Sequence, residues 1–110
     1  MKNPEFIRRL NQAIYFVLNQ ENVRDIYGEQ QENLYRLMFV AQACLESGWG
    51  CHYPVETNNP LGIKPVGNQL FGEYVGADGP KTKLRIFESL EKCAESWLYL
   101  VLKSENYNEP

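Results

Sequence analysis

The segment "LYRLMFVAQACLESGWG" (residues 34–50) joins an apolar helical pattern to an abrupt glycine-rich stop. Its apolar residues recur at every third or fourth position, which is the period of one helix face, and glycine is a typical residue just after a helix. The spacing therefore predicts a central helix that runs from Leu34 to a stop at Gly48. We expect its buried stripe to consist of Leu34, Leu37, Met38, Ala41 and Leu45.

Two more helices are predicted, one on each side of this segment. Asn3 can cap a first helix with Pro4 at its first position, and Ser89 can cap a last helix with Glu91 in its first turn. The polar residues 19–33 predict a loop with a short helical turn. The expected buried residues are Phe6, Ile7, Leu10, Ile14, Val17 and Leu18 in the first helix and Leu90, Cys93, Ala94, Trp97, Leu98 and Val101 in the last.

The sequence changes character between the central and last helices. Residues 70–75 and 83–87 are short and fairly rich in aromatic or branched side chains, and "GADGP" (residues 76–80) between them supplies turn residues. This pattern predicts a small β-hairpin that lines one wall of a cleft. The predicted fold class is therefore α+β, mainly α, with residues 1–110 forming a single domain.

Composition excludes several classes of protein. The 110 residues are 44% hydrophobic and 23% charged, which indicates an ordinary globular chain, and no apolar run is long enough to cross a bilayer. The net charge of -3 and the absence of a basic run argue against a nucleic-acid partner. Cys44, Cys51 and Cys93 show no metal-binding spacing, so we expect reduced cysteines and no metal site. Residues 1–10 lack the pattern of a secretory signal.

Glu46 lies in the last turn of the predicted central helix, on the flank of the apolar stripe beside Gln42. The negative end of the helix dipole and partial burial beside Trp49 would both favour a protonated carboxyl group, which a general acid requires. A solvated glutamate at a helix end is the ordinary alternative. Gly48 and Gly50 favour the chemical interpretation, because they allow unusual positions of the backbone and the Trp49 ring.

The stretch "TNNPLGIKP" (residues 57–65) is typical of an ordered loop. Its Asn side chains can bond to the loop's own backbone, or they can meet the hydroxyl or acetamido groups of a sugar. Both interpretations of Asn58 and Asn59 stay open at this point.

Three stretches, "AQACLESGWG" (41–50), "NNPLGIK" (58–64) and "RIFESLEKCAESWLYLVLKSENY" (85–107), resemble the bacterial endo-β-N-acetylglucosaminidase family of flagellar and autolysin glucosaminidases. The resemblance follows the family's order over most of the chain. It implies a lysozyme-like fold and cleavage of the peptidoglycan glycan strand without a cofactor. The chain departs from the family at Pro60, where an aliphatic residue is usual, at Leu61, which replaces the usual Phe, and in its short hairpin.

The resemblance also implies roles for individual residues. Glu46 corresponds to the catalytic acid, and the family's second carboxylate corresponds to Glu73 on the hairpin, with Asp78 as its rival and Glu88 as a less suitable candidate. We expect Glu73 to act as the base of an inverting route or to stabilise attack by the substrate's own acetamide. The expected sugar-contacting residues are Trp49, Asn58, Asn59, Tyr74 and Tyr107, with Tyr53 and Phe71 as further candidates for stacking.

The predicted function is hydrolysis of the peptidoglycan glycan strand, at the N-acetylglucosaminyl linkage, in the periplasm or cell wall. The alternatives are a lytic transglycosylase or muramidase on the same fold, a non-catalytic peptidoglycan-binding module, and a small helical interaction protein. Without a recognisable signal peptide, we expect synthesis in the cytoplasm. Delivery would then need a secretion apparatus, phage lysis or attachment to a larger protein.

Overall fold

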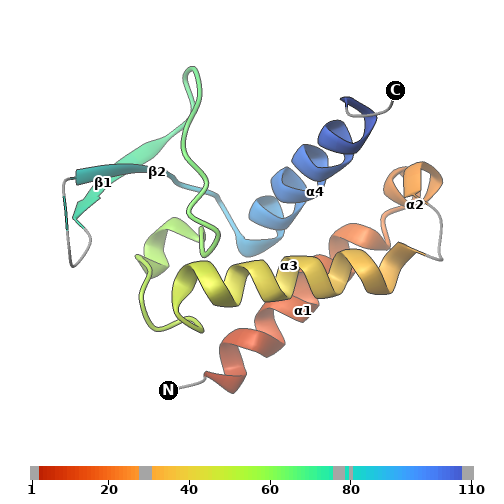
Figure 1. Ribbon diagram of the computed structural model, residues 1–110, viewed down its shortest axis with the longest axis horizontal. Helices are drawn as coiled ribbons and strands as arrows, with labels where there is room; N and C mark the ends of the chain where they lie inside the picture. Colours follow the sequence, from red (N-terminus) through yellow and green to blue (C-terminus); the bar gives the residue numbers. More distant parts are fainter. Residues whose placement is uncertain (1–2, 28–30, 76–78, 80, 108–110) are drawn as a thin grey trace.

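The computed structural model describes residues 3–27, 31–75, 79 and 81–107. Helices α1, α3 and α4 form the body of the molecule, and a two-stranded hairpin projects from one side (Figure 1). This arrangement confirms the predicted α+β class, mainly α. The elements are α1 (Pro4–Leu18), α2 (Glu21–Tyr27), α3 (Glu32–Ser47), the 3-10 turn η2 (Val55–Thr57), β1 (Phe71–Val75), β2 (Lys81–Arg85) and α4 (Leu90–Tyr107).

Both predicted helix caps are formed. Asn3 Oδ1 accepts a hydrogen bond from the Phe6 N–H at 3.2 Å, and Ser89 Oγ accepts one from the Lys92 N–H at 3.2 Å. Each bond satisfies an N–H group that a helix start leaves unpaired. The predicted faces of α1 and α4 are confirmed, since Phe6, Leu10, Ile14, Val17, Leu18, Leu90, Cys93, Ala94, Trp97 and Leu98 are buried, and Ile7 and Val101 are partly buried.

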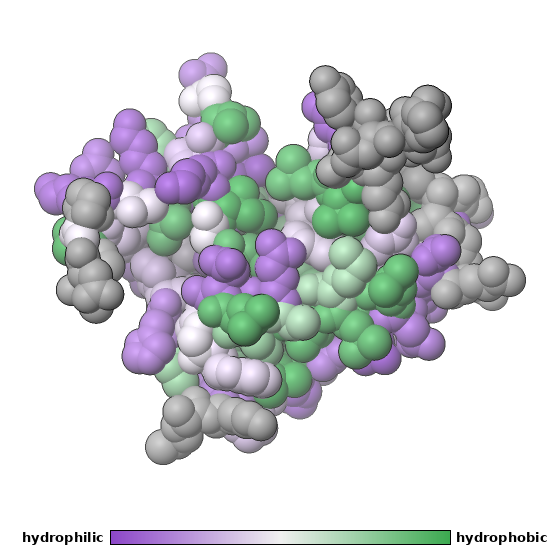
Figure 2. Space-filling view, in the orientation of Figure 1, coloured by the Kyte–Doolittle hydropathy of each residue, from purple (hydrophilic) through white to green (hydrophobic). Residues whose placement is uncertain are grey.

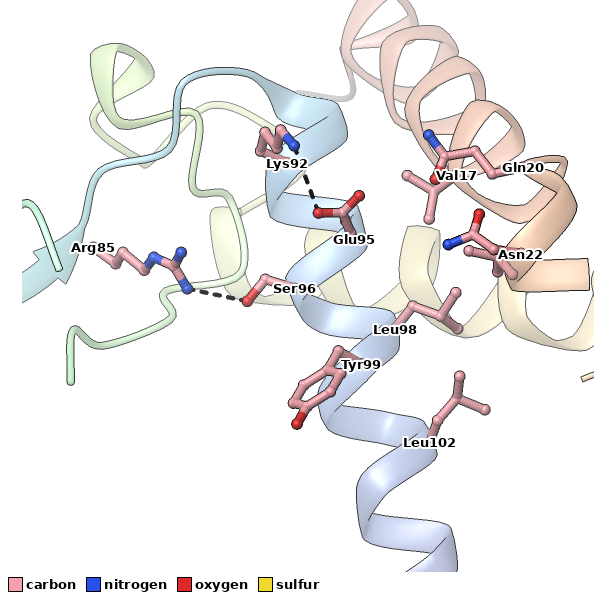
Figure 3. Close-up of a pocket in the computed structure, with 11 residues that line it drawn as sticks. Val17, Gln20, Asn22, Arg85, Lys92, Glu95, Ser96, Leu98, Tyr99 and Leu102 are labelled. Carbon is pink, nitrogen blue, oxygen red and sulfur yellow. Dashed lines mark hydrogen bonds and ion pairs between the residues drawn. The ribbon is translucent and has the colours of Figure 1, made fainter. Parts of the chain in front are cut away.

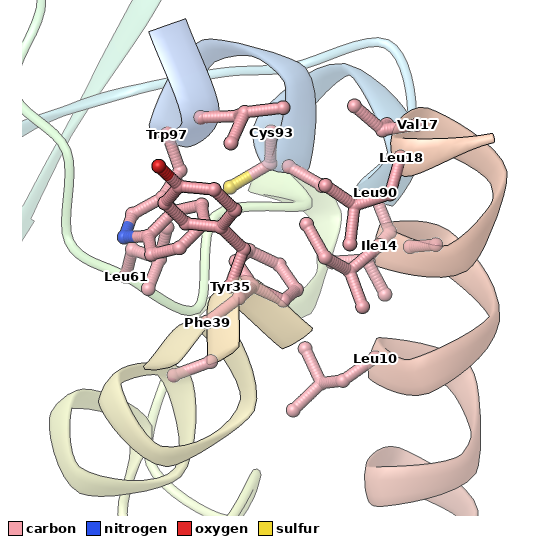
Figure 4. Close-up of a cluster of buried hydrophobic side chains, with 14 of the residues drawn as sticks. Leu10, Ile14, Val17, Leu18, Tyr35, Phe39, Leu61, Leu90, Cys93 and Trp97 are labelled. Carbon is pink, nitrogen blue, oxygen red and sulfur yellow. The ribbon is translucent and has the colours of Figure 1, made fainter. Parts of the chain in front are cut away.

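The hydrophobic core lies where α1, α3 and α4 meet (Figure 4). Phe39 of α3 and Trp97 of α4 pack edge to face, with ring centroids 5.3 Å apart and an angle of 63° between the planes. Such a pair adds about 0.5–1.5 kcal/mol beyond the area that it buries. Leu10 and Ile14 pack from α1, and Leu61 adds a residue from the loop after η2.

The buried face of α3 is not the predicted one. Leu34, Leu37, Met38, Ala41 and Leu45 are all exposed, with Leu37 at 61% and Leu45 at 78% of their full accessible area. Figure 2 shows hydrophobic side chains along α3 on the visible face of the molecule. The residues that α3 buries are Tyr35, Phe39, Ala43, Cys44 and Ser47.

The reason is that α3 carries two apolar faces with the same period. Tyr35, Phe39 and Ala43 recur every four residues just as Leu37, Ala41 and Leu45 do, so spacing alone does not distinguish them. Aromatic rings bury more apolar area than leucine, and Trp97 of α4 provides an edge-to-face partner for Phe39. The face that contains the rings therefore turns toward α1 and α4.

The region between α1 and α3 is more helical than predicted. Residues 21–27 form α2, and α3 begins at Glu32, two residues before the predicted start. Because α2 has only seven residues, its stability depends on its neighbours more than on its own sequence.

The predicted hairpin is present, with shifted boundaries. Strands β1 and β2 pair antiparallel, with Phe71 opposite Arg85 and Glu73 opposite Lys83. Beyond the end of β2, the Ile86 N–H still donates across the hairpin to the Leu70 carbonyl at 2.9 Å. The Phe87 N–H donates instead to the Thr57 carbonyl at 2.8 Å. The chain after β2 is thus attached to the preceding loop.

In the part of the chain that the structure covers, no helix combines the length and apolar character needed to cross a membrane.

Substitution of Phe39 and Leu45 tests which face of α3 is buried. We expect Phe39→Ala to lower the free energy of unfolding by about 3–5 kcal/mol, because it truncates a core ring. Leu45→Ser should change it by less than about 0.5 kcal/mol, because the side chain is largely in solvent. Urea denaturation measures both values. Similar losses from the two substitutions would contradict the observed burial.

Gly50→Ala tests how α3 ends against α1. Gly50 has a φ of +85°, and a Cβ atom there would lie 2.4 Å from Cγ of the buried Phe6. Gly67→Ala is the matched control, because Gly67 also has a positive φ but no atom within 4 Å of the added Cβ. We expect a loss of about 1–2 kcal/mol for Gly67→Ala from backbone strain, and at least about 1–3 kcal/mol more for Gly50→Ala from the clash. Equal shifts in thermal melts would exclude the clash.

Candidate active site

Glu46 is the second-last residue of α3, and the turn that follows holds the helix end in place. The Cys44 carbonyl accepts the N–H groups of Gly48 and of Trp49, the latter at 2.7 Å, and the His52 N–H donates to the Ser47 carbonyl at 2.9 Å. The buried Ser47 hydroxyl donates to Ala43 and accepts from the Gly50 N–H at 3.0 Å. These bonds give Glu46 a rigid attachment.

The carboxyl group of Glu46 is not partly buried as predicted. Glu46 is exposed, and Trp49 keeps 40% of its accessible area. The reason is that Gly48, Trp49 and Gly50 all adopt a positive φ, which turns the chain sharply away after the helix end. In this structure the protein does not shield the Glu46 side chain from solvent, so only a bound ligand could do so.

A cavity of about 220 Å³ lies one helical turn from Glu46, between α3, the loop after η2 and α4. Gln42 connects the two, because it lies four residues before Glu46 on the same side of α3. The Trp97 Nε1–H donates to Gln42 Oε1 at 3.0 Å, across 55 positions in the sequence. We call this space the α3–α4 cavity; its lining residues are Gln42, Leu61, Ile63, Trp97, Leu100 and Val101.

Sequence reasoning did not identify the α3–α4 cavity. The sequence offers one signal for it, which is that Gln42 is a polar residue within an apolar helical segment. Its partner Trp97 reads as an ordinary core residue, and it is indeed 97% buried by area, with 3% exposed. Only the packing of α4 against α3 brings the two together.

Asn59 is buried and its side-chain amide is fully used within the protein. Its Nδ2 donates to the Ile63 and Arg85 carbonyls at 2.8 and 2.9 Å, and its Oδ1 accepts from the Ile63 N–H at 3.0 Å. Both amide hydrogens are therefore engaged, and the side chain is 1% exposed. This arrangement corrects the expectation that Asn59 contacts a sugar: Asn59 holds the loop against the end of β2.

Asn58 also bonds to the chain after β2. Its Nδ2 donates to the Phe87 carbonyl at 3.0 Å, and its backbone is left-handed with a φ of 51°. The side chain borders a cavity of about 240 Å³ at the start of α4, which Glu46 does not line. The structure thus favours the backbone-bonding interpretation for both asparagines.

Glu73 lies in the middle of β1, exposed and directly opposite Lys83 of β2. Cross-strand partners share a face of the hairpin, so Phe71 and Arg85 lie on this face as well. Lys83 Nζ is 5.0 Å from the centre of the Phe71 ring, which makes a cation–π contact. Tyr74 lies on the other face, with its ring folded over Gly72.

The remaining predicted residues are spread over several elements. Tyr53 packs on the Phe6 ring, with centroids 5.6 Å apart, and its burial raises the pKa of its hydroxyl group. Glu88 is exposed just before α4. Tyr107 is the last residue of α4, and its side chain lies outside the described part of the structure, as does all of Asp78.

A larger cavity of about 440 Å³ lies between α4, α2 and the end of α1 (Figure 3). Arg85 lines it and donates to Ser96 Oγ at 3.2 Å. The carboxylate among its described lining residues, Glu95, pairs with Lys92 at 3.7 Å. Neither Glu46 nor Glu73 lines this cavity, and among its described lining residues there is no unpaired carboxyl group for bond cleavage.

None of the three cysteines forms a disulfide; Cys51 is exposed, and Cys44 and Cys93 have the character of packing residues. Cys44 and Cys93 are buried, which raises the pKa of both thiols, that of Cys93 to about 12. A protonated, buried thiol is a poor nucleophile and a poor metal ligand. Within the described residues, no group of three His, Cys, Asp or Glu side chains is placed to hold a metal ion.

Comparison with solved structures supports the lysozyme-like fold. The glycoside hydrolase domain of Salmonella typhimurium FlgJ matches 97% of this chain with a TM-score of 0.70 and 23% identity, and this chain spans 65% of that domain's length. A C-terminally truncated form of that domain matches 96% of this chain with a TM-score of 0.64 and 20% identity, over 77% of its own length. No protein-family model and no curated protein matches the sequence. The TM-scores of 0.70 and 0.64 establish a shared fold, and at identities of 23% and 20% the comparison establishes the fold alone.

Asn59→Ala tests the structural role of the buried amide. The substitution leaves the Arg85 carbonyl without its Asn59 donor and the Ile63 N–H without its acceptor, whereas the Ile63 carbonyl still accepts the Arg85 N–H. We therefore expect the free energy of unfolding to fall by about 2–4 kcal/mol, as for two partly buried backbone groups left unpaired. Asn68→Ala, at an exposed position in the same loop, should change it by less than about 0.5 kcal/mol. Guanidinium denaturation measures both, and a small effect at Asn59 would show that its hydrogen bonds are dispensable.

Proposed function

We propose that this chain cleaves the glycan strand of peptidoglycan by general acid catalysis at Glu46. One observation supports the proposal most directly: an exposed carboxyl group stands on the rigid end of α3, one turn from a cavity, in a chain that shares its fold with a glycoside hydrolase domain. The choice of peptidoglycan as the substrate rests on the family resemblance of the sequence around Glu46.

In the proposed reaction the Glu46 carboxyl group donates its proton to the oxygen of the glycosidic bond. The C–O bond then breaks, and positive charge develops on the sugar left behind. A bound glycan would cover Glu46 and exclude water from it, which the free protein does not do. Hydrolysis is completed when water adds to the sugar carbon and its proton passes to a base.

We propose Glu73 as the second group. It is exposed on the hairpin, which Figure 1 shows on the same side of the molecule as the C-terminal end of α3. Glu73 would either activate the water of an inverting reaction or stabilise attack by the substrate's own acetamide. The linkage proposed for cleavage is the N-acetylglucosaminyl bond.

The aromatic side chains beside these carboxyl groups are the proposed sugar contacts. Trp49 and Phe71 are exposed enough to stack on pyranose faces, and Tyr74 is half-buried on the hairpin. From the resemblance, we also propose that Tyr107 contacts the sugar at the cleft. Asn58 is proposed as a sugar contact at the edge of that cleft. We further propose that the protein acts in the periplasm or cell wall, reached through a secretion partner, by phage lysis or as part of a larger protein.

Glu46→Gln tests the proposal. The amide preserves shape but has no proton to donate, so release of soluble muropeptides from purified peptidoglycan should fall by about 10²–10⁴-fold, the usual contribution of a general acid. Glu56→Gln, at an exposed glutamate of η2, is the matched control and should retain activity. Because both positions are exposed, neither substitution should alter the melting temperature.

The products distinguish the alternatives. Mass analysis of the new sugar ends separates N-acetylglucosamine from N-acetylmuramic acid reducing ends, and both from the anhydro-sugar of a lytic transglycosylase. A transglycosylase needs one carboxyl group, so Glu73→Gln would then retain full activity. Binding to peptidoglycan without release of any fragment by the folded wild-type protein would replace the hydrolase proposal with a non-catalytic binding module.

A further inference from the structure

The α3–α4 cavity combines apolar walls with one oriented amide. Leu61 is buried, Ile63 and Val101 are half-buried, and Leu100 lies at the rim. Among the lining residues that the structure describes, none carries a charge. We propose that this cavity binds the acetamido group of an N-acetylated hexosamine, with the methyl group against the apolar walls and the carbonyl oxygen accepting a hydrogen bond from Gln42. The inference rests on the proposed function, because it assumes a glycan substrate.

The orientation of the Gln42 amide follows from the chemistry of its partner. The Trp97 indole N–H is a donor and has no acceptor, so Gln42 must turn its oxygen toward Trp97. The NH₂ end of the planar amide then points away from the indole. Because Gln42 is an exposed residue, that NH₂ group is a donor available to a ligand in the cavity. Trp97 thus acts as a positioning residue for Gln42.

The size and chemistry of the cavity favour an acetamido group over other sugar substituents. Its volume of about 220 Å³ corresponds to roughly seven water molecules, enough for an acetamide and the edge of its sugar ring but too small for a disaccharide. A free ammonium group would lose its hydration there without meeting a carboxylate among the described lining residues. A hydroxyl group would leave the apolar walls unfilled.

The cavity is placed to orient a sugar relative to Glu46. Gln42 and Glu46 lie four residues apart on the same side of α3, which separates them by about 6 Å along the helix axis. A sugar whose acetamido group contacts Gln42 therefore has its ring beside Glu46. This assigns to Gln42 the recognition role that the engaged amide of Asn59 cannot fill.

Binding of two neutral tetrasaccharides tests the inference. Chitotetraose and cellotetraose share length and linkage, but only chitotetraose carries acetamido groups. Isothermal titration uses the Glu46→Gln chain so that no ligand is cleaved. We expect chitotetraose to bind at least about tenfold more tightly, the effect of one hydrogen bond and one buried methyl group. In NMR spectra, chitotetraose should also shift the Trp97 indole N–H signal.

Two substitutions added to the Glu46→Gln chain examine the two halves of the cavity. Gln42→Glu keeps an oxygen for the Trp97 N–H but replaces the NH₂ donor, and Val101→Phe fills the apolar space. Each should reduce the preference for chitotetraose to within about twofold. Tyr99→Ala is the control, because Tyr99 lines the larger cavity between α4, α2 and the end of α1, not the α3–α4 cavity, and its loss should leave the preference unchanged. Melting curves identify any variant that fails to fold, and we expect Gln42→Glu to fold because it replaces an exposed side chain.

The outcomes separate this inference from the proposed function. If the wild-type chain releases muropeptides but the preference survives both substitutions in folded protein, the cavity assignment is wrong and the hydrolase proposal stands. If no muropeptides are released but both substitutions abolish the preference, the assignment stands without catalysis. Absence of any preference for chitotetraose, with an unmoved Trp97 signal, would also overturn the assignment.

Discussion

The buried amide of Asn59 is the interaction on which the arrangement of the site depends. Two carbonyl groups accept its hydrogens, one from Ile63 in the loop before the hairpin and one from Arg85 at the end of β2. The Phe87 N–H to Thr57 bond at 2.8 Å reinforces the same junction. A loop with little regular structure therefore positions both the hairpin and the start of α4, and through α4 the wall of the α3–α4 cavity.

Helix α3 provides the other constraint. On its buried face, Phe39 packs against Trp97 of α4. Its C-terminal end is held by Ser47, whose hydroxyl donates to the Ala43 carbonyl and accepts from the Gly50 N–H. Because the backbone at this end is fixed on both sides, a carboxyl group at Glu46 can be exposed without being mobile at its attachment. That combination suits a group that must meet a large polymeric substrate at the surface.

The two sides of the proposed site divide the chemistry between them. In the proposal, helix α3 supplies the acid and the oriented amide of Gln42, while the loop and α4 supply apolar surface from Leu61 and Val101. The hairpin carries Glu73 and the Phe71 ring on a separate element. Contacts between helices would thus build the recognition of a substituent, and the hairpin would add the proposed second carboxyl group.

The sequence by itself determined the elements whose signals are local. Caps at Asn3 and Ser89, the apolar faces of α1 and α4, the turn that ends α3 and the hairpin all follow from spacing and from the conformations that individual residues prefer. The place of Glu46 in the last turn of α3 is also local information, because Gly48 marks the end of the helix wherever that helix packs. Its role as the candidate acid comes from the family resemblance of the surrounding sequence.

Only the tertiary structure decided which face of α3 is buried and which amides remain available to a ligand. Both faces of α3 have the same period, and the choice depended on how Phe39 fits Trp97, 58 positions along the chain. Asn59 and Gln42 carry the same functional group, yet one is consumed by carbonyls of the protein and the other is oriented by an indole. Hydrogen bonds between residues distant in sequence have no local signature, so their partners become known only once the chain is folded.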